Sequence, residues 1–282
     1  MLKDNLGILH PGEMGITVAL AAQNSGLRVY WASAERSPQT SKRAKDLGLI
    51  DAESLSKLCQ ICSTLICVCP PDAAPEVAEQ VSSLGFSGLY IDANAISPQR
   101  ALRIAQTLQD TGITFVDGSI IGAPAWKANT TRLYLSGEHA NKAAEKFAAG
   151  PMGVNVIGDS IGQASALKMC YAAYTKGTSA LLCTILAAAE ALGIRDDLLE
   201  EWSQSGSNFS EEATTRVRRV TAKAWRFGGE MEEIAATFKS VGLPDGFHSA
   251  AAEIYMRLSD YKDSPLPELD DVLSSLLEPQ PD

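Results

Sequence analysis

Hydrophobic and polar positions follow two different patterns along this chain of 282 residues. Up to about residue 158, short runs of apolar and β-branched residues alternate with amphipathic stretches that have helical spacing. Strand, crossover helix and strand in succession are typical of a parallel, doubly wound sheet. We predict strands at 6–9, 28–31, 65–68, 89–92, 114–117, 132–136 and 155–157, and helices that include 15–25, 39–47, 74–84 and 98–110.

The second pattern begins near Pro151. Eight of the 13 prolines lie at or before Pro151, and none lies between residues 152 and 243. Because a proline inside a helix removes a hydrogen bond and clashes with the preceding turn, a long proline-free stretch rich in Ala, Leu and Glu is most simply helical. The sequence therefore predicts an α/β Rossmann-type domain with a doubly wound sheet over residues 1–160. An all-α domain over residues 161–282 follows, with a long linking helix near 163–192.

Composition and charge narrow the classes of protein. The chain is 45% hydrophobic, which provides for a substantial core, and its formal net charge is −10. Nucleic acid and anionic membrane surfaces repel such an acidic chain. No uncharged helical run is long enough to span a bilayer, and no N-terminal signal is visible. We expect a soluble, cytoplasmic protein that acts on a small molecule, without nucleic-acid or membrane partners.

Six cysteines raise the question of metal or redox chemistry. Cys59 and Cys62 have C-x-x-C spacing, but a redox pair of this kind sits at a helix start after a strand, and here the strand follows. Cys67 and Cys69 occupy alternate positions of a predicted buried strand, where they face one side as small apolar residues. A zinc site would need a second ligand pair in suitable geometry. We therefore predict no metal site.

A turn with the sequence HPGEMG, at residues 10–15, connects the first strand to the first helix. In the fingerprint G-x-G-x-x-G of dinucleotide-binding proteins, the first glycine makes the turn, the second lets the backbone approach the pyrophosphate, and the third lets helix and strand pack closely. Gly12 and Gly15 occupy the second and third places, and His10 replaces only the turn-making glycine. Because helix N-termini favour phosphates, we predict a dinucleotide site that includes Gly12, Glu13, Met14 and Gly15.

The residues after the second strand bear on the choice of dinucleotide. NAD enzymes usually place an acid at this strand end for the ribose 2′-hydroxyl, and here the strand tip carries none. Ser33, Arg36 and Ser37 supply hydroxyls and a guanidinium suited to a 2′-phosphate. Glu35 is close enough in sequence to bind a ribose hydroxyl instead. We predict NADP as the cofactor in preference to NAD.

Four segments resemble those of the β-hydroxyacid dehydrogenases, a family that includes 6-phosphogluconate dehydrogenase and, more distantly, the imine reductases. The resemblance covers nearly the whole chain and is greatest to a little-characterised branch of dehydrogenases. The segments are HPGEMG at 10–15, YIDANAISP at 90–98, VDGSIIGAP at 116–124 and GQASALKMCY at 162–171.

The resemblance also implies functions for single residues. It implies that Asn94 lies beside the nicotinamide and that Lys168 is the catalytic lysine. It also implies that residues 117–122 are a substrate-binding loop, in which Ser119 lines the substrate site. Read without the family, Lys168 lies in an apolar helix, where a partly buried ammonium can exchange protons with a substrate or extend to the surface. Tyr171 follows on roughly the same helix face. We further expect Cys69 and Pro70 to contact the cofactor.

The departures from the family concern the substrate. Four residues after the lysine, the family's usual asparagine is Ala172, and its serine-glycine-glycine run is IGA at residues 121–123. The reaction class carries over, and the substrate does not. We predict hydride transfer between NADP and a small hydroxy acid, carbonyl or imine compound in an interdomain cleft. The alternative is a non-catalytic NADP-binding sensor or scaffold. The resemblance implies a homodimer, and His248 and Glu230 either line the cleft or are structural.

Overall fold

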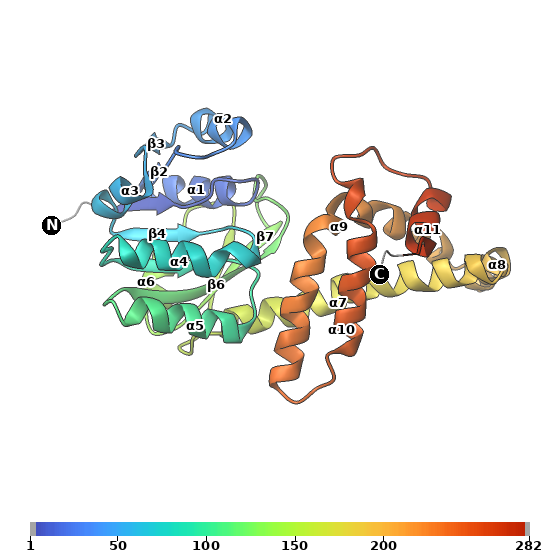
Figure 1. Ribbon diagram of the computed structural model, residues 1–282. Coiled ribbons are helices and arrows are strands. Elements are labelled where there is room, and N and C mark those ends of the chain that lie inside the picture. The colour runs from blue at the N-terminus through green and yellow to red at the C-terminus, as the bar shows by residue number, and fades with distance from the viewer. Residues whose placement is uncertain (1–3, 280–282) are drawn as a thin grey trace. The chain divides into compact units, whose positions relative to one another are not determined.

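The computed structural model describes residues 4–279 and divides into two compact units, Met1–Met169 and Cys170–Asp282. The first unit is built on one eight-stranded sheet with the strand order β3-β2-β1-β4-β5-β6-β7-β8 (Figure 1). Neighbouring strands are parallel except β6 and β7, which are antiparallel. The strands are β1 Asn5–Ile8, β2 Arg28–Trp31, β3 Ile50–Asp51, β4 Thr64–Cys67, β5 Leu89–Asp92, β6 Thr114–Gly122, β7 Thr131–Ser136 and β8 Gly153–Gly158.

Helices cover both faces of this sheet, as the alternation of strand residues requires. Within β4, Ile66 packs into the core on one face and Leu65 into the core on the other. The first core includes α1 and α6, and the second includes α3, α4 and α5. The helices of this unit are α1 Gly15–Asn24, α2 Pro38–Asp46, α3 Leu55–Ile61, α4 Ala74–Ser83, α5 Pro98–Gln109 and α6 Ala140–Glu145. The predicted Rossmann-type fold is confirmed.

Local signals explain where several of these helices begin. The side chains of Ser37, Ser54 and Ser97 accept hydrogen bonds from backbone N–H groups in the first turns of α2, α3 and α5. Serine is a favoured residue at this position because it satisfies an N–H group that has no partner within the helix. Pro38 and Pro98 follow at the first helical position, where the missing N–H of proline costs nothing.

Two parts of the sheet differ from the sequence prediction. β3 is absent from the prediction because it has only two residues, and both are exposed, so it carries no hydrophobic signal. Residues 118–122, expected as part of a substrate-binding loop, instead form the second half of β6. They pair with β7 from Gly118↔Leu135 to Gly122↔Thr131. This pairing satisfies the backbone of a glycine-containing stretch, and local sequence does not reveal it.

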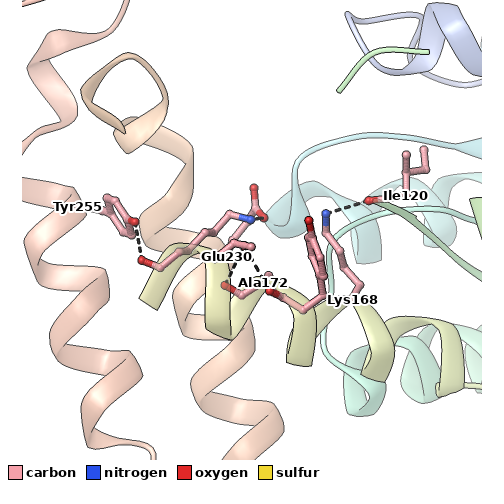
Figure 2. Close-up of polar contacts among 8 residues, drawn as sticks. Ile120, Lys168, Ala172, Glu230 and Tyr255 are labelled. Atoms are coloured by element: carbon pink, nitrogen blue, oxygen red, sulfur yellow. Dashed lines mark hydrogen bonds and ion pairs between the residues drawn. The ribbon is translucent and has the colours of Figure 1, made fainter. Parts of the chain in front are cut away.

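The second unit is helical. The long helix α7, Gln163–Ala191, lies where a helix is expected near 163–192; it begins in the first unit and ends in the second. The other helices are α8 Arg195–Trp202, α9 Phe209–Ser240, α10 Gly246–Arg257 and α11 Leu269–Leu277. The hydroxyl of Tyr255 on α10 donates to the backbone carbonyl of Lys176 on α7 at 2.7 Å (Figure 2). Within residues 4–279, no helix is long and apolar enough to cross a membrane.

Candidate active site

The turn between β1 and α1 has the two properties that a dinucleotide site needs. A Cβ atom added to Gly15 would lie 2.0 Å from the carbonyl oxygen of His10, so the helix approaches the preceding turn as closely as only glycine allows. A Cβ atom added to Gly12 would meet nothing within 4 Å. The first turn of α1 carries no acidic residue, and Met14 at its N-cap makes no side-chain cap. The turn therefore fits a pyrophosphate, with close packing at Gly15 and open space at Gly12.

The segment after β2 holds a buried cationic donor. Nε of Arg36 is buried and has no hydrogen-bond partner among residues 4–279. The backbone N–H of Arg36 donates to the carbonyl of Ser33 at 3.2 Å and closes a turn. Glu35, inside this turn, has a φ of 61°, in the left-handed region. The Ser37 hydroxyl is already used, because it caps α2 through Thr40. Arg36 is thus the group here that best fits an anion such as a 2′-phosphate.

The ends of β4 and β5 meet through Asn94. The buried Asn94 side chain accepts a hydrogen bond from the backbone N–H of Cys69 through Oδ1, and its backbone N–H donates to Oδ1 of Asp92 at 3.0 Å. Nδ2 of Asn94 is buried, and the Asn94 side chain also hydrogen-bonds the Asp92 carboxyl and the Cys67 sulfur. Burial also raises the pKa of the Asp92 carboxyl well above its usual value. The amide of Asn94 is therefore held in place at the ends of β4 and β5.

Asp117 joins β6 to the start of α7. Its carboxylate accepts hydrogen bonds from the backbone N–H groups of Gly162 and Ser165, at 2.9 and 3.1 Å, and from the Ser165 hydroxyl at 2.6 Å. Ser136 on β7 donates to the same carboxylate at 3.0 Å. Burial raises the pKa of Asp117, and these hydrogen bonds counter part of that shift. A carboxylate at a helix N-terminus is favourable, so Asp117 fixes the position of α7 against the sheet.

Lys168 and Ser119 both depend on this junction. Lys168, partly buried on α7, donates from Nζ to the carbonyl of Ile120 on β6 at 2.8 Å, as Figure 2 shows. Ser119 is fully buried and donates to the carbonyl of Ala164 at 2.7 Å. The structure thus places the Lys168 ammonium at β6. The Ser119 hydroxyl, predicted to line the substrate site, is used to hold β6 to α7.

Candidate residues of the second unit fall into three environments. Tyr171 is 49% exposed. Lys176 and Glu230 form an ion pair at 2.8 Å, and each side chain is only 12% exposed. His248 is buried against the rings of Phe238 and Phe247, and burial lowers its pKa. His248 and the ion pair therefore pack within this unit, whereas Tyr171 presents its side chain to solvent.

Sequence reasoning missed two features of the site. The first is Asp117 as the cap of α7; its signal was an acid at a predicted strand end together with Ser165 in the first turn of a predicted helix. The second is the position of His10. It lies beside Cys67 and Cys69, with one ligand atom of each residue within 4.8 Å of the others. No local signal reveals this grouping, because His10 and Cys67 are far apart in the sequence.

Comparison with known proteins extends this picture. Residues 5–158 match the family described as the NAD binding domain of 6-phosphogluconate dehydrogenase. Residues 189–258 match a domain of unknown function, DUF1932. An uncharacterized 28.5 kDa protein in the 7S RNA 5′ region of Methanothermus fervidus is 31% identical over 215 residues, which cover 75% of this chain and 82% of that protein.

Solved structures share the fold over almost the whole chain. A conserved protein of unknown function, described as structurally similar to 3-hydroxyacid dehydrogenases, matches with a TM-score of 0.66 at 28% identity, over 97% of this chain and 100% of that one. The 3-hydroxyisobutyrate dehydrogenase of Salmonella typhimurium matches with a TM-score of 0.70, over 96% and 99% of the two chains. Its 19% identity shows the fold alone. Since the first family match covers more than half of the sequence, the chain belongs to the family of the NAD binding domain of 6-phosphogluconate dehydrogenase.

Proposed function

We propose that this protein is an NADP-dependent oxidoreductase that transfers a hydride between the nicotinamide and a small hydroxy acid, carbonyl or imine compound. One observation carries the proposal. Nε of Arg36, a buried side-chain donor of the first unit, has no hydrogen-bond partner among the described residues. An unsatisfied buried donor costs about 1–3 kcal/mol. A dinucleotide that met Arg36 with its 2′-phosphate would recover that cost, and Asn94 would lie near its nicotinamide.

The other proposed cofactor contacts follow from the same unit. The backbone from Gly12 to Gly15 would hold the pyrophosphate, because Gly12 has open space and the first turn of α1 carries no acid. Ser33 and Ser37 would flank the 2′-phosphate beside Arg36, with Ser37 contributing less because its hydroxyl caps α2. Cys69 and Pro70, directly after β4, would lie on the nicotinamide side together with Asn94.

The bound nicotinamide supplies or accepts the hydride. Lys168 would move the accompanying proton, because its ammonium is partly buried and is oriented by the carbonyl of Ile120. A positioned acid or base of this kind typically contributes about 10²- to 10⁴-fold to the rate. Tyr171, with its exposed phenol, is the second candidate for proton transfer.

The test is a pair of measurements on the full chain. Fluorescence titration should show NADPH binding at least about tenfold tighter than NADH, since a charge-assisted contact from Arg36 contributes about 1.5–3 kcal/mol. A panel of small hydroxy acids, aldehydes, ketones and cyclic imines should then give turnover with one class. Failure to bind either dinucleotide would refute the proposal.

A non-catalytic NADP-binding sensor or scaffold is the second candidate. Two observations on the substrate side favour it: Ala172 stands where hydroxyacid dehydrogenases usually carry an asparagine, and the Ser119 hydroxyl is used by the carbonyl of Ala164. Tight NADPH binding without turnover on the whole panel would support this candidate over the enzyme.

We also propose that the protein forms a homodimer. The second unit exposes large apolar side chains, among them Leu192 at 72% and Val241 at 70%. Exposed apolar side chains of this size favour association when they are contiguous. Light scattering of the purified chain should give twice the mass of the monomer, and a monomeric mass at micromolar concentration would contradict the proposal.

A further inference from the structure

Three metal-binding side chains gather at the carboxyl end of two neighbouring strands. His10 follows β1, Cys67 ends β4, and Cys69 lies two residues further; β1 and β4 pair directly in the sheet. One ligand atom from each residue lies within 4.8 Å of the other two. The sequence predicts no metal site here, because the alternating pattern indicates Cys67 and Cys69 as small apolar residues of a buried strand. Nothing in the sequence places His10 next to them.

The separation of the two sulfur atoms distinguishes between the possible uses of this cluster. Sγ of Cys67 and Sγ of Cys69 are 3.5 Å apart. Two thiolates on a tetrahedral zinc ion, each about 2.3 Å from the metal, lie about 3.8 Å apart. A disulfide needs about 2.05 Å, so the sulfurs would have to approach by about 1.5 Å. The spacing is that of the hydrogen bond that the Cys67 thiol donates to the Cys69 sulfur. It is also close to the spacing of two metal ligands and far from that of a disulfide.

The histidine supplies an independent observation. Nδ1 of His10 is buried and has no hydrogen-bond partner among the described residues. Neutral imidazole nitrogen and thiolate sulfur are the ligands that zinc prefers in proteins. Cys67 is buried, whereas His10 and Cys69 are partly exposed, so an ion from solution can reach the cluster.

The other C-x-x-C pair shows that close cysteines alone are not sufficient. Cys59 and Cys62 are both buried and unoxidised. Within residues 4–279, His10, Cys67 and Cys69 come this close to one another, whereas Cys59 and Cys62 have no third metal-ligating side chain at that spacing. Burial also raises the pKa of Cys59 to about 11 and that of Cys62 to about 12, so both stay protonated near neutral pH.

We propose that His10, Cys67 and Cys69 form a binding site for a thiophilic divalent cation of the zinc class. Three protein ligands leave one position of a tetrahedral ion open to water or to a small ligand, as in zinc sites that are not purely structural. The site shares Cys69 with the proposed cofactor contacts, but cation binding goes beyond the proposed oxidoreductase function, because it requires neither a dinucleotide nor turnover.

The experiment uses Co²⁺ as a spectroscopic probe of the reduced, full-length chain under argon and without dinucleotide. We expect one Co²⁺ per chain, with thiolate-to-metal charge-transfer absorption and the intense visible bands of tetrahedral coordination, and displacement of Co²⁺ by Zn²⁺. Competition with a chromophoric chelator then gives the Zn²⁺ affinity. Cys69→Ser and His10→Gln should each weaken the Zn²⁺ affinity by at least about 100-fold. Loss of a residue that only hydrogen-bonds a metal ligand already weakens metal affinity by up to about 100-fold, and these variants remove a ligand itself.

The variants are chosen so that the result is decisive. Cys69 and His10 are partly exposed, so both variants should keep the wild-type circular dichroism spectrum, and Cys67→Ser provides a third test. Cys170→Ser removes an exposed cysteine outside the cluster and should leave the Zn²⁺ affinity unchanged. The proposal is overturned if wild type shows no thiolate charge-transfer band, or if folded Cys69→Ser and His10→Gln keep the wild-type Zn²⁺ affinity. Loss of the band in Cys170→Ser, or a mass loss of two hydrogens in place of metal uptake, overturns it equally.

Discussion

Two alanine substitutions in the turn at residues 10–15, Gly12→Ala and Gly15→Ala, should separate the requirements of cofactor binding from those of folding. At Gly12 an added Cβ meets nothing within 4 Å, so Gly12→Ala should fold like the wild type. At Gly15 the same atom lies 2.0 Å from the carbonyl oxygen of His10, where real Cβ atoms do not come under 3.0 Å. The turn and the helix must then separate by about 1 Å, and no flexible side chain can absorb the shift.

The expected magnitudes follow from these contacts. Overpacking typically costs about 1–3 kcal/mol, and because a backbone atom is the neighbour, we take the upper end. Alanine is up to about 1 kcal/mol better than glycine inside a helix, which leaves a net loss of about 2 kcal/mol for Gly15→Ala. For a domain of this size that loss lowers Tm by about 4–8 °C. Gly12→Ala should stay within about 0.5 kcal/mol of wild type, as surface substitutions usually do.

Binding should show the opposite preference. In Gly12→Ala the methyl group stands where the backbone is proposed to approach the pyrophosphate. We expect Kd for NADPH to rise at least about tenfold, or about 1.4 kcal/mol, by fluorescence titration at a temperature where both variants are folded. Thermal unfolding followed by circular dichroism gives Tm. The reasoning is refuted if Gly12→Ala loses stability and keeps its affinity, or if Gly15→Ala melts with the wild type.

Three further predictions use other contacts. Lys168→Met should lower kcat by about 10²- to 10⁴-fold with little change in NADPH affinity, whereas the exposed Lys142→Met should not; equal kcat values in both would exclude Lys168 from proton transfer. Arg36→Ala should remove the preference for NADPH over NADH, and a preference that persists would locate the 2′-phosphate elsewhere. Burial lowers the pKa of His248, so the free energy of unfolding should fall as pH drops below the unfolded value of about 6.5. Urea titrations of His248→Gln should show a free energy of unfolding that changes less with pH than in the wild type. An unchanged pH dependence would mean that other groups cause it.

The fold could be predicted because its signals are local. Each buried strand of the first unit is a short apolar run whose alternate residues serve opposite faces, as Leu65 and Ile66 do. The absence of proline between residues 152 and 243 correctly indicates the helices α7, α8 and α9. β3 carries no such signal, because Ile50 and Asp51 are exposed and the strand forms only by pairing with Trp31 and Tyr30.

The candidate site could be predicted only in part, for a related reason. The spacing of Gly12 and Gly15 is a local signal, and the structure gives each glycine the surroundings that its place in the fingerprint requires. The contact of Lys168 with Ile120 depends on how α7 is set against β6. That placement comes from Asp117, which binds residues far along the chain. The same contacts use the Ser119 hydroxyl for the fold, which its place in a motif does not reveal.

The grouping of His10 with Cys67 and Cys69 shows what sheet order adds to a motif. In the sequence, His10 stands in for a turn-making glycine, and the cysteines follow the period of a buried strand. In the sheet, β4 lies directly beside β1, and the carboxyl ends of parallel strands share one edge. A residue that replaces glycine at the end of β1 therefore faces whatever side chains end β4. Cysteines stand at the end of β4 and two residues after it, so a histidine in place of the turn glycine adds a third ligand to the two sulfur atoms. This gives a chemical reason for His10 in the turn that backbone geometry alone does not supply.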